Sequence, residues 1–195
     1  MRRLFGSMAV LALALALAVP VAAQDKGMEK KMETKPAAAA GGVKADFLRS
    51  LGDAQKKLLA LAEAMPADKY GWRPGEGVRS VGEVFAHVAG ANYFIPTLWG
   101  TKMPDGVDPR GFEKAGGDKA KTIDTLKKSF DHATQAIQNL PDADLGKAVK
   151  IFDHEGTYRE AVLIIVSHAH EHLGQSIAYA RSNNVVPPWS QKGGM

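Results

Sequence analysis

The stretch "REAVLIIVSHAHEHLGQSIAYARSN", residues 159–183, decides the fold that we expect for this chain. It contains no proline, and Thr157 with Glu160 at its start matches the Ser/Thr-x-x-Glu pattern of a helix capping box. Residues 161–166 are apolar on every side, which is typical of a helix enclosed by other elements. The stretch therefore predicts one long helix at the centre of a domain.

This predicted helix carries three of the six histidines of the chain, at positions 168, 170 and 172. Residues four apart share a helix face, whereas at about 100° per residue His170 points roughly 160° away from the other two. His168 and His172 can therefore reach one metal ion together, a spacing that recurs in zinc sites. The alternative for this pair is two ordinary histidines on a buried or interfacial face.

Three further helices are predicted from apolar residues at steps of three and four. They cover residues 44–65, 80–95 and 119–140, and each is stopped or bent by the proline that follows. Ser80 and Glu83 form a second capping box. Residues 103–118 and 141–156 are linking loops, the latter with an optional extended piece at 147–152. Four helices with two long connections indicate an all-α four-helix bundle.

His87 is the best candidate for a third ligand, because it lies in the apolar and small-residue run "VFAHVAGA" of the second helix. A buried histidine is costly without a polar partner, and catalytic metal sites use three protein ligands with an open position. Alone, His87 would more simply be a core histidine bonded to a backbone group or a hydroxyl. Glu83, one turn earlier, is the best candidate general base, although capping already accounts for it. His132 and His154 lie among charged residues and are expected to be solvated, with a place at the rim of a site as the alternative for His154.

Two longer stretches resemble the DinB-like (DinB/YfiT) superfamily: residues 70–92, "YGWRPGEGVRSVGEVFAHVAGAN", and residues 156–188, from "GTYREAV" to "NNVVPP". The resemblance implies an up-down-down-up four-helix bundle over residues 44–190. It also implies a divalent metal held by His87, His168 and His172. Relatives include transferases that use low-molecular-weight thiols, and others are described as hydrolases.

Around His172, the last of the three implied ligands, two residues differ from the family pattern and two match it. Glu171 and Leu173 replace a histidine and an arginine that are frequent in the family, which puts their role in substrate binding in doubt. Gly174 and Gln175 match the pattern. A glycine lets another helix approach closely, and Gln175 is either a donor to the metal ligands or a surface residue.

The N-terminal residues predict export. Arg2 and Arg3 precede a short apolar run, and small residues lead to Ala23, so residues 1–23 are interpreted as a signal peptide cleaved before Gln24. The apolar run is shorter than the ~20 residues of a spanning helix, so no stable membrane insertion is expected after cleavage. Residues 24–43 read as a flexible linker. The mature protein is therefore expected in the periplasm or outside the cell.

Composition narrows the possible partners. Removing Arg2 and Arg3 lowers the formal net charge from +4 to +2, which together with export argues against nucleic acid. The chain has no cysteine, so a metal has to be held by His, Asp or Glu. Nitrogen ligation suits Zn, Ni, Fe or Cu and leaves the metal unidentified.

Two functions stay open for the chain. One is a metal-dependent transferase or hydrolase acting on an unidentified small molecule, although export weakens the analogy with enzymes that use cytosolic thiols. The other is a non-catalytic metal- or ligand-binding module of the cell envelope. Small residues in "AHVAGA" suit close helix packing, and relatives are often dimers, so a homodimer is also predicted.

Overall fold

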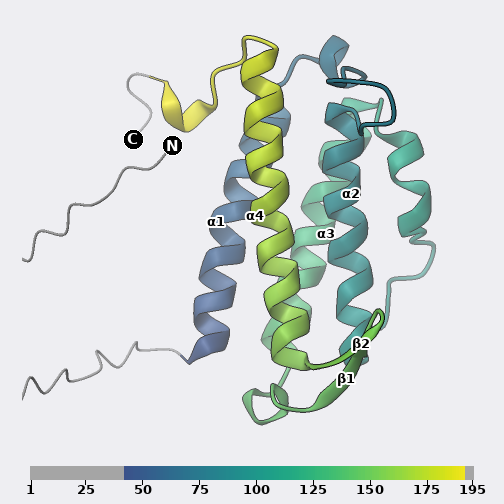
Figure 1. Cartoon of the computed structure of the whole chain (residues 1–195), viewed down its shortest axis with the longest axis vertical. Coiled ribbons are helices and arrows are strands. Elements are labelled where there is room, and N and C mark those ends of the chain that lie inside the picture. Colours follow the sequence, from purple (N-terminus) through teal and green to yellow (C-terminus); the bar gives the residue numbers. More distant parts are fainter. Residues whose placement is uncertain (1–41, 192–195) are drawn as a thin grey trace, which may run out of the picture. The chain divides into compact units, whose positions relative to one another are not determined.

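The computed structural model describes residues 42–191 and contains four long helices (Figure 1). They are α1 (Val43–Ala64), α2 (Val81–Phe94), α3 (Lys119–Asn139) and α4 (Tyr158–Ser182). Helices α2 and α3 run opposite to α1 and α4 (Figure 1), which confirms the predicted all-α, up-down-down-up bundle. Within residues 42–191, short 3-10 helices lie in the connections: η1 (Ala67–Lys69), η2 (Ile95–Trp99), η3 (Pro109–Gly111), η4 (Glu113–Ala115) and η5 (Asp142–Asp144). A further one, η6 (Pro188–Ser190), follows α4.

Both predicted caps form at the starts of their helices. The Ser80 hydroxyl accepts from the Glu83 N–H at 3.3 Å, and the Glu83 carboxylate accepts from the Ser80 N–H at 2.7 Å. At α4, Thr157 accepts from the Glu160 N–H at 3.3 Å. The Glu160 carboxylate instead contacts His154 at 3.0 Å, so only half of the second capping box is present.

Helix α4 is one corner of the bundle rather than its centre. It packs against α1 and α2, and α3 packs against the same two helices from the other side. Its apolar run is not enclosed, because the Leu163 side chain is 49% exposed. The prediction of a central helix was therefore wrong, since the strongly apolar stretch also faces solvent. The core comes from the inward faces of all four helices, with Leu51, Leu58, Val84, Phe85, Leu126, Phe130, Ile137 and Ile165 fully buried.

The connection between α2 and α3 returns alongside α2 instead of looping freely. Two glycines bring its backbone against the helix: a Cβ on Gly82 would lie 1.7 Å from the carbonyl oxygen of Gly116. One helical turn from the end of α2, a Cβ on Gly90 would lie 3.3 Å from the carbonyl oxygen of Pro109. The small residues of α2 thus accommodate the chain's own loop.

The connection between α3 and α4 forms a two-stranded antiparallel hairpin. Strand β1 (Ala148–Ile151) pairs with β2 (His154–Thr157), and Ile151 lies opposite His154. The extended piece expected at 147–152 therefore exists, but its partner strand was not predicted. Phe152, in the two-residue turn, has a left-handed backbone with φ of 51°.

Among residues 42–191 no helix is long and apolar enough to cross a membrane. The expected signal peptide, residues 1–23, lies outside the described residues, as does most of the expected linker, residues 24–43. Helix α1 begins at Val43, the last residue of that linker.

Candidate metal centre

Three imidazoles meet in the space between α2 and α4. His87 comes from the middle of α2, and His168 and His172 come from successive turns of α4. The Nε2 atom of His168 lies 3.1 Å from Nε2 of His87 and 3.1 Å from Nε2 of His172. One ligand atom from each residue lies within 4.8 Å of the other two. The structure thus brings together the three histidines singled out from the sequence.

The spacing of these nitrogens fits a shared ion. Zinc–nitrogen distances are about 2.0–2.1 Å, which separates two tetrahedral nitrogen ligands by roughly 3.3 Å. The observed Nε2 separations of 3.1 Å are close to that value. The His168 and His172 rings are inclined by 74°, and those of His87 and His172 by 82°. The rings therefore approach one point from different directions.

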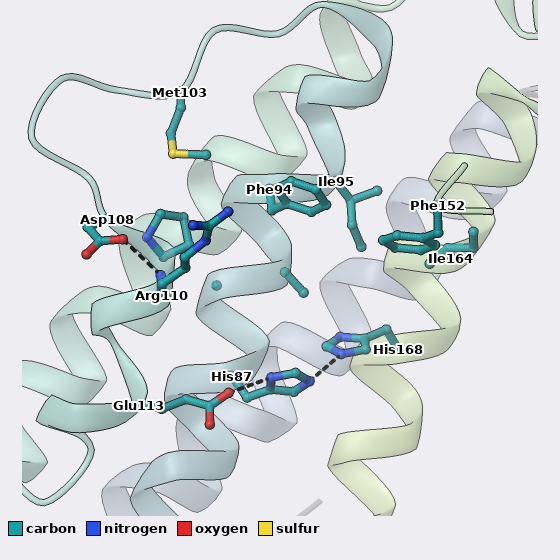
Figure 2. Close-up of a pocket in the computed structure, with 13 residues that line it drawn as sticks. His87, Phe94, Ile95, Met103, Asp108, Arg110, Glu113, Phe152, Ile164 and His168 are labelled. Atoms are coloured by element: carbon teal, nitrogen blue, oxygen red, sulfur yellow. Dashed lines mark hydrogen bonds and ion pairs between the residues drawn. The ribbon is translucent and has the colours of Figure 1, made fainter. Parts of the chain in front are cut away.

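The outer nitrogens of two of the rings are held by oxygen acceptors. The Nδ1–H of His87 donates to Oε1 of Glu113 at 2.9 Å (Figure 2), and that of His172 donates to Oε1 of Gln175 at 2.8 Å. Because these acceptors require a proton on Nδ1, the Nε2 lone pairs are directed into the cluster. The sequence left open whether Gln175 contacts a ligand, and the structure shows that it does.

Glu113 and Gln175, which accept the Nδ1–H bonds of His87 and His172, are both linked to Arg79 by hydrogen bonds. The Arg79 guanidinium donates from Nε to Oε2 of Glu113 at 3.1 Å. On the other side, Gln175 donates from Nε2 to the Tyr179 hydroxyl at 2.9 Å, and that hydroxyl donates to the Arg79 carbonyl at 3.3 Å. The residue just before the Ser80 cap therefore fixes the groups that orient His87 and His172.

The environment disfavours protonation of two of the three rings, His87 and His168. Burial, reinforced by His172 and His87 and by the charge of Arg79, lowers the pKa of His168 to about 3. Burial and the Arg79 charge also lower the pKa of His87. Although burial raises the pKa of Glu113, hydrogen bonds from Arg79 and His87 bring it below its ordinary value. Neutral imidazoles are the form that binds metal ions.

The remaining histidine of the opening stretch faces elsewhere. The Nε2 atom of His170 lies 3.0 Å from the Ser50 hydroxyl of α1, which confirms that His170 does not join the other two. His154 is exposed, as predicted, and pairs with Glu160 at 3.0 Å. Glu83 was the best candidate base, but its carboxylate is engaged by the Ser80 N–H and by Arg73 at 3.1 Å. The structure thus assigns Glu83 to capping.

Two expectations about other residues were wrong. His132 is only partly exposed rather than solvated: its ring centroid lies 5.1 Å from that of Tyr93, and its Nε2 atom is buried. Gly174 does not let a helix approach, because it is exposed and an added Cβ would meet nothing within 4 Å. Tyr93 of α2 packs against His132, whereas nothing packs against Gly174, and a pattern within a single helix reveals neither fact.

A pocket of about 770 Å³ opens over the cluster. His87, His168 and Glu113 lie along one end, and Phe94, Ile95 and Phe152 lie across the other (Figure 2). Its volume is within the range of small-molecule sites, roughly 300–1,000 Å³, and such sites are mostly apolar with a few polar groups. The three-histidine cluster is therefore reachable by a small molecule.

Fold and site together define a four-helix bundle protein with a three-histidine cluster, two members of which, His87 and His168, line a pocket. The model of the DinB superfamily matches residues 50–176, so the chain belongs to the DinB superfamily. No curated protein matches the chain.

Solved structures with the same fold include three from Bacillus species. A DinB-like protein of Bacillus cereus has a TM-score of 0.62 at 17% identity over 74% of this chain and 95% of its own. The DinB-like protein YjoA of Bacillus subtilis has a TM-score of 0.55 at 15% identity over 71% of this chain and 92% of its own. YfiT of Bacillus subtilis, described as a probable metal-dependent hydrolase with an unusual four-helix bundle topology, has a TM-score of 0.59 at 19% identity. That match covers 73% of this chain and 88% of YfiT. At these identities the likeness concerns the fold.

Proposed function

We propose that the chain is a metal-dependent hydrolase of a small molecule, with a divalent ion held by Nε2 of His87, His168 and His172. This proposal rests on the convergence of three imidazoles, with Nε2 of His168 lying 3.1 Å from that of each of the other two, beside a pocket that His87 and His168 line. Zn, Ni and Fe all suit such a nitrogen set. The description of the structural neighbour YfiT as a probable metal-dependent hydrolase is consistent with it.

The ion would supply Lewis-acid chemistry by polarising an electrophilic group of the substrate and acidifying water. The protein's own part is orientation: Glu113 and Gln175 hold two rings so that their Nε2 atoms face inward. His87 and His168 line the pocket, so the open side of the ligand set faces the space where a substrate would lie. Hydrolysis is preferred to thiol transfer because the proposed export separates the protein from cytosolic thiols.

A non-catalytic metal- or ligand-binding module is the second candidate function. It is favoured by one observation: the Glu113 carboxylate, which touches the cluster, is bonded to both His87 and Arg79. It is therefore not free to act as a general base. Hydrolysis of a panel of small esters, amides and lactones by the metal-loaded protein separates the two candidates. Turnover that stops with a chelator and returns with metal supports the enzyme, and stoichiometric metal with no turnover supports the module.

The metal itself is tested by elemental analysis of protein purified without a histidine tag. We expect close to one divalent ion per chain, and a melting temperature that falls on chelation, because a ligand of the folded state stabilises it by mass action. Protein with no stoichiometric metal, and with a melting temperature that added Zn, Ni or Fe does not change, would contradict the proposal.

The proposal also places the mature protein in the periplasm or outside the cell, on the basis of the basic and apolar pattern of residues 1–23. Mass spectrometry of protein from the cell envelope should find Gln24 at the N-terminus, and an intact Met1 there would argue against export. The homodimer stays a prediction, although its stated basis is weaker because Gly90 packs on the chain's own Pro109. Light scattering after size exclusion tests it.

A further inference from the structure

The end of the pocket away from the histidines is formed by two aromatic rings. Phe94 ends α2 and Phe152 lies at the tip of the β1–β2 hairpin, and their ring centroids are 6.4 Å apart with planes inclined by 21°. Phe94 is 43% exposed and Phe152 is 59% exposed. Single exposed apolar residues are ordinary on protein surfaces, but two that stack on each other and line the same pocket form one continuous apolar surface.

The backbone conformation of Phe152 is a second indication that this surface binds a ligand. Its φ of 51° lies in the left-handed region, which glycine and asparagine adopt at little cost and bulky residues rarely occupy. Two-residue hairpin turns generally place Gly, Asn or Asp at such a position. Strained backbone of this kind clusters at ligand-binding sites. Here the turn carries a phenyl ring that lines the pocket beside Ile164 (Figure 2).

The rest of the lining points to apolar selection rather than charge selection. Ile95, Met103 and Ile164 also line the pocket and add to its apolar surface. Asp108 and Arg110 lie together on another side of the pocket and carry opposite charges. Their formal charges sum to zero, so outside the histidine end the lining carries no net charge.

We infer that Phe94 and Phe152 form a subsite for an apolar, preferably aromatic, body of the substrate, whose reacting polar group lies at His87 and His168. The substrate class is then an amphiphilic small molecule, such as an aryl or branched alkyl ester, amide or lactone. The placement of the reacting group rests on the proposed function, whereas the aromatic subsite stands on the pocket itself.

Two hydroxamates test the subsite in the full-length, zinc-loaded protein, because both present the same metal-binding group. Acetohydroxamate carries only a methyl group, and benzohydroxamate carries a phenyl ring. Burial of the ring is worth about 25 cal/mol per Å² of apolar area, so we expect benzohydroxamate to bind about ten- to a hundred-fold more tightly by calorimetry. Equal affinities would overturn the subsite and leave the metal site standing.

Substitutions localise the effect. Phe152→Gly suits the left-handed backbone and should fold at least as well as the parent, and Phe94→Ala removes the stacked partner. Each should reduce the affinity for benzohydroxamate about three- to tenfold and leave acetohydroxamate unchanged. Leu163→Ala is the matched control, because Leu163 is comparably exposed on α4 and does not line the pocket. A preference that survives both phenylalanine substitutions would contradict the assignment.

A metal-free arm separates this inference from the proposed function. Benzyl alcohol added to the chelated protein should shift the amide resonances of Phe94 and Phe152 in the parent and not in Phe152→Gly. If neither hydroxamate binds while benzyl alcohol does, the proposed metal function fails and the subsite holds. If benzyl alcohol gives no shift at these residues, the subsite is wrong whatever the hydroxamates do.

Discussion

Two regions of the bundle enclose histidines, and they use them differently. Between α2 and α4, burial lowers the pKa of His168, and its Nε2 meets those of His87 and His172 at 3.1 Å. Between α2 and α3, burial also lowers the pKa of His132, but its ring packs on Tyr93. The buried Nε2 of His132 has no hydrogen-bond partner among residues 42–191.

The two regions differ in the convergence of their nitrogens rather than in burial. Both regions keep histidine neutral, which is necessary for metal binding. Only the α2–α4 region directs several lone pairs to one point and holds the outer nitrogens with Glu113 and Gln175. Predictions that separate convergence from burial therefore test the proposed centre most directly.

The largest effect is expected from removing a ligand. His168→Ala should abolish stoichiometric metal, because two imidazoles give an incomplete site. His132→Ala should retain it, because that ring lies in the other region. Elemental analysis of the purified variants, with melting curves with and without chelator, measures this. In His168→Ala the chelator should no longer shift the melting temperature.

His170→Ala is the control within the same helix, since its ring contacts Ser50 on α1. It should keep its metal. If His170→Ala loses the metal and His168→Ala keeps it, the proposed ligand set is wrong and His170 has to be assigned as a ligand in place of His168.

The next largest effect is expected at Gly82, where the connection before α3 touches α2. A Cβ there would lie 1.7 Å from a backbone oxygen of Gly116, so backbone has to move. Overpacking typically costs about 1–3 kcal/mol, and we expect Gly82→Ala to fall near 3 kcal/mol in urea unfolding. Gly52→Ala is the matched control, because a Cβ at this other helical glycine meets nothing within 4 Å. Equal stability of the two variants would contradict the close contact.

A smaller effect is expected from the residues that support the ligands. Glu113→Ala and Gln175→Ala each remove the acceptor for an Nδ1–H of the cluster. Loss of such a partner usually weakens metal affinity about 10- to 100-fold without removing the site. Competition with a chromophoric chelator measures this. Glu171→Ala changes an exposed residue of α4, the helix that carries Gln175, and should leave the metal affinity unaltered.

Much of this architecture could be predicted from local sequence. The helices follow from apolar steps of three and four, and their ends follow from Ser80, Thr157 and the prolines that stop them. The pairing of His168 with His172, and the exclusion of His170, follow from helical spacing. His87 as the third member needed the apolar context and the family resemblance, because no local rule joins α2 to α4.

Glu113 could not be predicted, because it lies in a segment rich in Gly and Pro with no periodicity. Its contact with His87 depends on the Gly82–Gly116 approach, which is a tertiary contact. His132 was misjudged for a similar reason. Its neighbours along α3 are charged, but Tyr93 from α2 covers its ring.

The smallest effect concerns the unpartnered histidine and its pH dependence. His132→Phe keeps an aromatic ring against Tyr93 and removes a buried nitrogen without a partner, a group that costs roughly 1–3 kcal/mol. We expect a gain in unfolding free energy of about 1 kcal/mol at pH 7 in chelated protein. A loss of stability would mean that the imidazole makes a favourable contact that the aromatic ring cannot replace.

The sign of the pH effect follows from the lowered pKa of His132. An unfolded histidine binds a proton below about pH 6.5, and the folded protein resists it, so the parent loses stability as the pH falls from 7 toward 5. Phe has no such proton. The advantage of His132→Phe over the parent should therefore widen toward pH 5, by less than about 1.4 kcal/mol per pH unit. Urea unfolding at pH 8, 7, 6 and 5 tests this directly. An advantage that narrows in acid would show that His132 is protonated in the folded protein and therefore does not share the lowered pKa of His168.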